Sequence, residues 1–320
     1  MKRHSLAAVC AAIALYGITQ PLLATSGFAT RELNPILQPI YLPSLVPVKT
    51  ENGWRVDHSL FITNDLQETD RGSERLIIDA ENYRYELDVS HRRNHWLTHI
   101  TIPLMATRGG ELDSTIETWH DLFGLPNGDR GKFPQDKVNI QYERDGIVEY
   151  SQTESSSGIG DIALAIGYQP TGKPAYFAGI ELPTGSESDF TGNEAIDFAF
   201  WISHEAGVSA NTNAYGMLGI SFPADDGQLE GLVRDEVWVA QLGFDYRFSN
   251  DYIGTVQLDM HGETIKNSDL DAFGESFQLL LALGFPTLLE NHRLDLFFTE
   301  DVHVNSAPDI TFGLRLSREY

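Results

Sequence analysis

Apolar residues alternate with small, polar or charged residues in about a dozen separate stretches of this chain. In three of these stretches the apolar side chains are Trp54-Val56-Leu60-Ile62, Ile162-Leu164-Ile166-Tyr168 and Phe277-Leu279-Leu281-Leu283-Phe285. A repeat of two residues places alternate side chains on opposite faces of a β-strand. The pattern therefore predicts an all-β protein. A water-soluble sandwich and a transmembrane barrel both fit it, and the leader and the connections favour the barrel.

The N-terminus has the features of an export signal. Lys2 and Arg3 begin it, an apolar run extends from Leu6 to Ile18, and small residues occupy positions 24–27. This order is typical of a secretory signal peptide, and the run is shorter than the roughly 20 residues that a membrane-spanning helix needs. We expect residues 1–24 to be removed, with cleavage after residue 24 or after residue 26.

The processed chain is strongly acidic and lacks cysteine. The full chain has 22 Lys+Arg and 46 Asp+Glu, and its single cysteine is Cys10 in the leader. Loss of Lys2 and Arg3 leaves 20 basic against 46 acidic residues, a net charge of −26. Such acidity argues against nucleic acid as a partner. A mature chain without cysteine has no disulfide and no thiolate metal site.

No later segment is apolar over a length that would make a transmembrane helix, so a membrane protein with this sequence must be a closed barrel. We predict an antiparallel up-and-down transmembrane β-barrel over residues 53–320, located in a bacterial outer membrane. Twelve strands are expected, near 53–64, 75–90, 95–107, 159–169, 174–183, 195–206, 213–222, 235–248, 251–262, 273–285, 292–302 and 310–320. Fourteen strands remain an alternative if Val138–Tyr150 forms a complete hairpin.

Connection lengths and the C-terminus support this interpretation. Short connections alternate with longer, more acidic ones near 65–74, 108–158, 184–194, 223–234, 263–272 and 303–309, as periplasmic turns and outside loops do in outer-membrane barrels. The chain ends in alternating apolar residues and an aromatic, Tyr320. This ending is typical of clients of the barrel-assembly machinery. We expect a monomer whose other partners are outer-membrane lipid and lipopolysaccharide.

Two segments outside the strands are distinctive. Prolines at 35, 39, 43 and 47 disfavour both helix and central strand in residues 27–52. We expect an extended or polyproline-like periplasmic lead-in, or a plug within the barrel. The 108–158 loop is predicted to cover the mouth, with a short helix near 113–123. Its candidate cap residues are Trp119, His120, Phe123 and Arg130.

The inward face of the predicted strands is ionic. A charge on the lipid face would cost roughly 2–4 kcal/mol at the bilayer midplane, so these residues are expected to line the lumen. The candidate wall consists of Arg55, Asp57, Arg84, Glu86, Asp88, Asp197, Asp245, Arg247, Asp259, Arg293, Asp295 and Arg315. Two interpretations remain open. The wall forms a polar conduit for a small solute, or it forms a salt-bridge network that fills a closed barrel.

Enzymatic chemistry has weak support in the sequence. His58 and His204 lie on the apolar faces of their strands, whereas the adjacent Ser59 and Ser203 point to the opposite faces. In neither of these pairs do the nucleophile and the base therefore share a face. We expect no catalytic residues, no metal and no cofactor.

Three stretches together resemble a known family: Thr30-Arg31-Glu32-Leu33-Asn34-Pro35, His120–Arg130, and Ser157-Gly158-Ile159-Gly160-Asp161-Ile162. They are similar to gram-negative proteins known only as a domain of unknown function, with signal peptides and barrel-like bodies. The resemblance implies a barrel and no catalytic residues. Passive uptake or binding of a small solute is the leading hypothesis. A closed structural or surface-interaction barrel is the second, and a lipid-modifying outer-membrane enzyme is the third.

Overall fold

The computed structural model describes residues 27–30, 33–46, 51–110, 137–289, 291–302, 307–308 and 310–320. The expected leader and the four expected cap residues, Trp119, His120, Phe123 and Arg130, lie outside these ranges.

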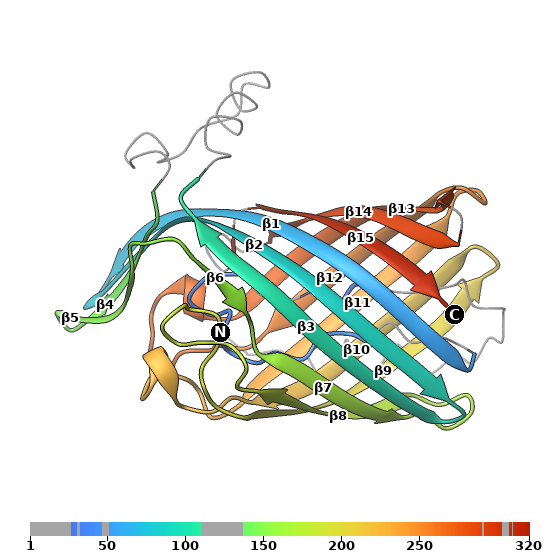
Figure 1. Cartoon of the computed structure of the whole chain (residues 1–320), viewed down its shortest axis with the longest axis horizontal. Helices are drawn as coiled ribbons and strands as arrows, with labels where there is room; N and C mark the ends of the chain where they lie inside the picture. The colour runs from blue at the N-terminus through green and yellow to red at the C-terminus, as the bar shows by residue number, and fades with distance from the viewer. Residues whose placement is uncertain are drawn as a thin grey trace, which may run out of the picture.

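Twelve of the described strands form a closed antiparallel barrel (Figure 1). They are β1 (Gly53–Arg71), β2 (Glu74–Arg93), β3 (Trp96–Arg108), β7 (Ile162–Tyr168), β8 (Ala175–Leu182), β9 (Asp197–Ser209), β10 (Thr212–Phe222), β11 (Val237–Arg247), β12 (Ile253–His261), β13 (Ser276–Leu289), β14 (His292–Asp301) and β15 (Ile310–Glu319). Each strand pairs with its neighbours along the chain, and β1 pairs with β15 from Arg55↔Glu319 to Asn64↔Ile310. The predicted twelve-stranded barrel is confirmed.

Three short strands lie outside the ring. A hairpin of β4 (Asn139–Arg144) and β5 (Ile147–Gln152) adds to β2, through pairs from Glu74↔Arg144 to Asp79↔Asn139. β6 (Ser156–Ile159) pairs with β3. The alternative of fourteen barrel strands is therefore wrong, because the 138–150 hairpin extends one edge of β2 and does not enter the ring.

The loop predicted at 65–74, at the same end of the barrel, is mostly paired strand in the structure. β1 and β2 stay paired as far as Arg71↔Glu74, so only Gly72 and Ser73 connect them. Gly72 has a φ of +63°, a conformation that glycine adopts without a Cβ penalty. Paired strands of this length exceed the 9–11 residues that span a bilayer, so they project beyond it. Because the longer connections also gather here, we call this the outer end.

The outside of the barrel is apolar. Leu218, Phe244 and Val256, on three neighbouring strands, are each about half exposed. Aromatic side chains form a rim at the opposite end, where Trp54 stacks on His91 and Trp96 packs edge-on against Tyr168. An apolar belt with an aromatic rim suits the hydrocarbon and interface of a bilayer. The described residues include no helix that is both long and apolar enough to cross a membrane.

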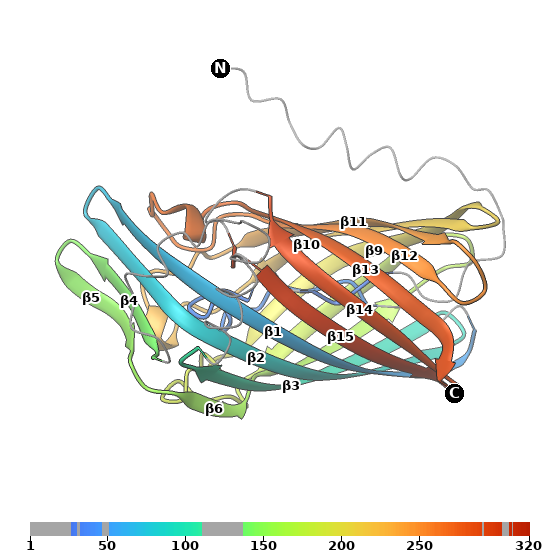
Figure 2. The same ribbon diagram turned by 90° about the horizontal axis from the view of Figure 1, so that it is seen from above.

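Residues 27–30 and 33–46, here called the luminal segment, lie inside the barrel (Figure 2). Their side chains are almost all buried, and Ile36 and Leu37 have 0% and 1% exposure. The expected extended or polyproline-like form is wrong for residues 35–39, which form turns. The carbonyl of Asn34 accepts the N–H groups of Leu37 and Gln38, and the Asn34 side chain accepts the N–H of Ile36. Pro35 fits this turn because the first residues of a helical turn need no N–H donor.

The wall is thinned where the luminal segment passes. A Cβ placed on Gly179 would lie 2.5 Å from the Tyr41 hydroxyl and 2.8 Å from the Trp201 ring. A Cβ on Gly27 would lie 2.5 Å from Leu45, so the two legs of the segment touch each other. The small inward residues of the sequence therefore make room for a second part of the same chain.

Candidate functional site

Two glutamines of the wall hold the luminal segment. Gln257 on β12 accepts the N–H of Phe28 at 2.9 Å and donates to the Phe28 carbonyl at 3.1 Å. Gln241 on β11 accepts the N–H of Leu45 and donates to Thr30. Both amides also donate to Asp259, at 2.6 and 2.8 Å. Buried backbone groups need hydrogen-bond partners. These side-chain amides supply them for a segment whose backbone is not paired with a β-strand.

Arg315 joins the wall to the start of the luminal segment. Its guanidinium donates to the Gly27 carbonyl at 2.7 Å and lies 3.7 Å from the centre of the Phe28 ring. The same guanidinium donates to Asp295 at 3.0 and 3.1 Å. Arg293 bonds the other oxygen of Asp295 at 2.7 Å, so one buried carboxylate lies between two arginines. Charge-assisted hydrogen bonds of this kind are the strong ones.

The predicted charged wall faces inward. Eleven of its twelve members are buried, and Arg247 is half-buried. Three Arg residues pair with the carboxylate two positions further on the same strand: Arg55 with Asp57, Arg84 with Glu86, and Arg293 with Asp295. Residues i and i+2 share a face of a strand, so an Arg-x-Asp/Glu pattern in the sequence is the signal for these pairs.

The other four wall carboxylates bond mainly neutral donors. Asp88 accepts from Thr101 at 2.6 Å and has His99 at 3.2 Å. Asp245 accepts from Thr255 at 2.6 Å. Asp259 has the two glutamines, and Asp197 accepts from the Asn193 amide and the Ala224 N–H. The lumen is therefore rich in carboxylate without being a chain of ion pairs.

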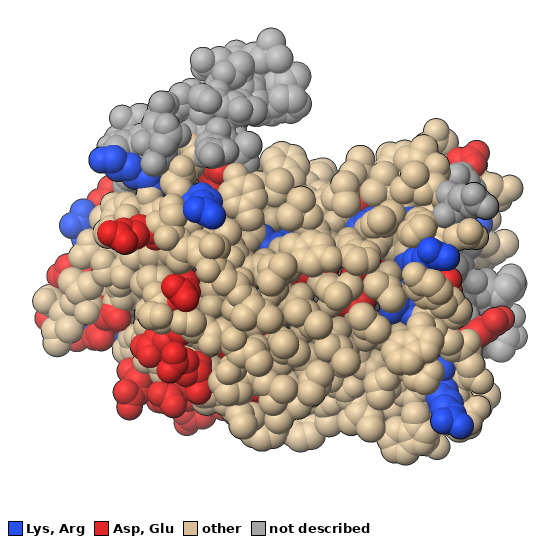
Figure 3. All heavy atoms as spheres, in the orientation of Figure 1, with Lys and Arg blue, Asp and Glu red and all other residues tan. Residues whose placement is uncertain are grey.

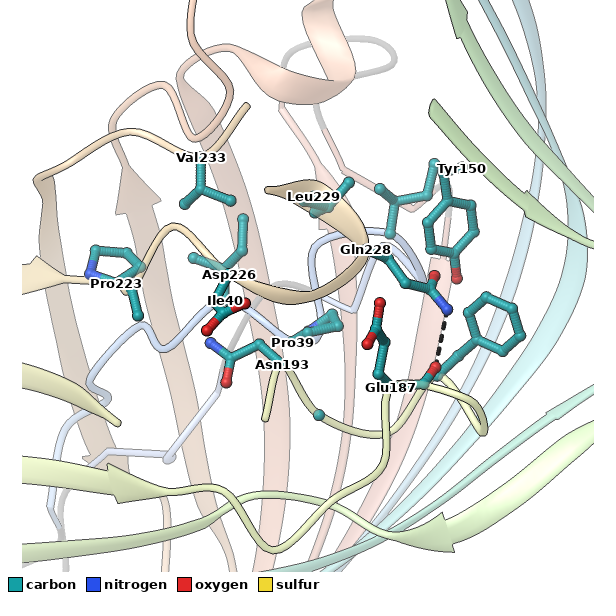
Figure 4. A pocket seen from close by; sticks show the side chains of 14 residues that line it. Pro39, Ile40, Tyr150, Glu187, Asn193, Pro223, Asp226, Gln228, Leu229 and Val233 are labelled. Atoms are coloured by element: carbon teal, nitrogen blue, oxygen red, sulfur yellow. Dashed lines mark hydrogen bonds between the residues drawn. The ribbon is translucent and has the colours of Figure 1, made fainter. Parts of the chain in front are cut away.

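A pocket opens at the outer end, above the tip of the luminal segment (Figure 4). It encloses about 400 Å³ of space, part of it open to solvent. Ile36, Pro39 and Ile40 of the luminal segment line it, together with parts of the 183–196 and 223–236 connections and Tyr150 of β5. Its polar lining consists of Glu187, Asn193, Asp226 and Gln228.

Buried carboxylates hold the connections that build the pocket. Asp161 accepts the N–H groups of Gly185 at 2.7 Å and Asn193 at 3.1 Å. A Cβ on Gly192 would lie 2.5 Å from the Asp161 carboxylate, so the loop closes tightly on this group. Gln228 donates to the Glu187 carbonyl at 2.8 Å and links the two connections. These hydrogen bonds therefore hold the two connections that form the pocket wall in place.

Sequence reasoning missed this pocket. Its residues come from four segments far apart in the chain, and none carries a local motif. Of the residues involved, Pro39 belongs to the proline spacing, and Asp161, which holds the loops, falls within Ser157–Ile162. The strand expected at 159–169 is interrupted at Gly160 and Asp161, which lie between β6 and β7.

A second brace ties the projecting hairpin to the 262–275 connection. Glu74 accepts from Tyr142 at 2.5 Å, from Arg144 at 3.0 Å, and from the N–H of Asp269 at 2.7 Å. Burial raises the pKa of the Glu74 carboxyl, but these hydrogen bonds outweigh it and hold the pKa below its ordinary value. Among the described residues, no cluster of three or more His, Cys, Asp or Glu side chains is arranged to hold a metal ion.

These features define a class: a transmembrane β-barrel whose lumen holds an N-terminal segment of its own chain. The chain belongs to the family described as protein of unknown function, DUF3187, whose model matches residues 5–320. The predicted resemblance to a family known only as a domain of unknown function is thus confirmed. No curated protein matches the sequence.

Several solved structures are similar to this chain. The COG4313 outer membrane channel from Pseudomonas putida F1 aligns with a TM-score of 0.55 and 12% identity, over 85% of this chain and 97% of that chain. The CymD monoaromatic hydrocarbon channel aligns with a TM-score of 0.42 and 11% identity, over 93% and 95%. The Ralstonia pickettii toluene transporter TbuX aligns with a TM-score of 0.42 and 8% identity, over 85% and 90%. The first likeness shows a shared barrel fold, which is consistent with a place in an outer membrane.

Proposed function

We propose that this protein is exported, loses its leader, and acts in the outer membrane as a monomeric barrel for the passive uptake of a small solute. The observation that carries the proposal is the luminal segment. A barrel that serves only as a scaffold can fill its interior with side chains of its own strands. Here the strands leave room at Gly179, and Tyr41 of a separate segment occupies that space.

Along most of its length this segment is held by neutral hydrogen bonds, which suit an element that can shift, and its charged contact is with Arg315 at Gly27. Gln241 and Gln257 offer neutral amide hydrogen bonds, each contributing about 0.5–1.5 kcal/mol net. Transport requires a segment that moves aside or leaves a narrow path beside it. The ionic wall and the 108–158 loop, with Trp119, His120, Phe123 and Arg130, are proposed to set selectivity. The fold of an outer-membrane channel supports this assignment.

The test is the conductance of the refolded full-length mature protein in a planar bilayer. The double variant Gln241→Leu and Gln257→Leu removes the amide contacts with the luminal segment, and we expect larger or longer openings. Gln67→Leu serves as the control, because Gln67 is buried on the projecting part of β1 and bonds Asp65. Silence from both the parent and the double variant, with correct folding in each, would refute uptake through the lumen.

A closed structural or surface-interaction barrel is the second candidate. The buried ion pairs Arg55–Asp57, Arg84–Glu86 and Arg293–Asp295 favour it, because they brace the wall from within. This candidate expects no conductance in any variant. A role as an enzyme is not proposed. His58 bonds Tyr85 on the outer face, while Ser59 is buried on the inner face.

A further inference from the structure

The pocket at the outer end has a one-sided lining. Its floor and one wall are apolar, formed by Ile36, Ile40, Leu229 and Val233. The 14 described residues that line it include two carboxylates, Glu187 and Asp226, and no Lys, Arg or His. In Figure 4 the side chains of Glu187 and Asp226 lie at the cavity, on opposite sides of the apolar floor.

Neither carboxylate is neutralised within the described chain. Asp226 accepts the N–H of Gly227 at 2.8 Å, and this is its only hydrogen bond. The Glu187 carboxylate takes part in no ion pair or hydrogen bond, since its residue is bonded through the backbone alone. Two basic groups of the outer-end connections are engaged elsewhere, because Lys266 pairs with Asp225 and Asp235 and Arg234 pairs with Glu263.

The chain around the pocket is also negatively charged. The two connections that build it, 183–196 and 223–236, contain eight Asp and Glu residues and a single basic residue, Arg234. Figure 3 shows acidic side chains gathered at this end of the barrel. A surface of one sign raises the local concentration of solutes of the opposite sign and speeds their arrival.

From this charge pattern and the apolar floor we infer that the pocket binds a small organic cation, a primary or substituted ammonium on a compact apolar body. The ammonium donates to the carboxylate of Glu187 or of Asp226, while the apolar body covers Ile36, Ile40 and Leu229. The aromatic ring of Phe190 supplies a further face for a cation. The inference deepens the proposed function and rests on it, since it takes this pocket as the place where the solute enters.

The test uses three probes of similar shape and different charge: benzylammonium, benzyl alcohol and benzoate. Binding to the detergent-solubilised full chain is measured by calorimetry. We expect benzylammonium to bind best and benzoate not to bind. The double variant Glu187→Gln and Asp226→Asn should weaken benzylammonium about ten-fold, the loss of about one hydrogen bond to a charged group.

Asp189→Asn is the matched control. It removes one negative charge from the 183–196 connection, which also carries Glu187, but Asp189 does not line the pocket, so binding should stay near that of the parent. Ala224→Phe, which places a ring at the pocket wall, should abolish binding of benzylammonium and benzyl alcohol alike. Equal affinity for benzoate and benzylammonium, or an unchanged affinity in the double variant, would overturn the inference.

The binding test is independent of the conductance test. Charge-selective binding in a barrel that never conducts would keep the cation site and reject uptake. Conductance together with equal binding of all three probes would keep uptake and reject the cation site.

Discussion

The carboxylate of Asp295 lies between two arginines, and its removal should be costly. Asp295 is fully buried and receives hydrogen bonds at 2.7 Å from Arg293 and at 3.0 and 3.1 Å from Arg315. Asp295→Asn keeps the shape of the side chain but removes the buried carboxylate to which both arginines are hydrogen-bonded. Breaking a buried ion pair from one side costs about 3–5 kcal/mol, since the remaining charge is uncompensated.

Urea unfolding of the refolded protein in detergent micelles, followed by the fluorescence of its five tryptophans, measures this loss. With a slope of about 1–3 kcal/mol per molar urea, the midpoint of the variant should fall by about 1 M or more. Glu68→Gln is the control, because Glu68 pairs with Arg75 at 2.8 Å on the exposed part of the barrel. An exposed pair contributes about 0–1 kcal/mol. A loss below about 1 kcal/mol for Asp295→Asn, or one equal to the control, would refute the reasoning.

Three further variants test other parts of the structure. Gly179→Val should displace the luminal segment and destabilise the barrel by about 1–3 kcal/mol, because its Cβ would collide with the Tyr41 hydroxyl. Gly158→Ala should be tolerated, since its Cβ would lie at ordinary contact distances from Thr191. Urea unfolding compares the stabilities of the two variants. Leu218→Arg places a charge in the apolar belt and should cost about 2–4 kcal/mol near midplane, measured in lipid vesicles, where a neutral result would argue against lipid contact. The Glu74 pKa lies below its ordinary value of 4.5, so its contribution to stability is present above that pH and is lost as the pH falls through the lowered pKa; hydrogen exchange in the 139–152 hairpin should rise there in the parent and not in Glu74→Gln.

The barrel could be predicted from the sequence because its rule is local. Alternation assigns each strand and its inner face without knowledge of the partner strand, and Arg55 and Asp295, which alternation assigns to that face, are both buried. The two-residue link at Gly72 and Ser73 was missed, because the polar residues before it are typical of loops and also of strands above the membrane.

The contents of the lumen could not be predicted to the same depth. The turn at Pro35–Pro39 depends on Asn34 as its cap and on burial by the whole barrel, so proline spacing alone gave the wrong local form. The outer pocket depends on loops that Asp161 and Asp197 bring together from different connections. These loops meet because the barrel is a closed ring, and no pattern along the sequence indicates that they do.

The ring closes where the first strand meets the last, and this seam constrains the order of assembly. Arg315 belongs to β15, the final strand, yet it bonds the carbonyl of Gly27, which is synthesised before every strand. Gly27 and Arg315 meet only when β1 and β15 come together. An N-terminal segment left outside at that moment would have to thread through a finished cylinder. Closure of the barrel, the last step of folding, therefore fixes the wall and the luminal segment at the same time.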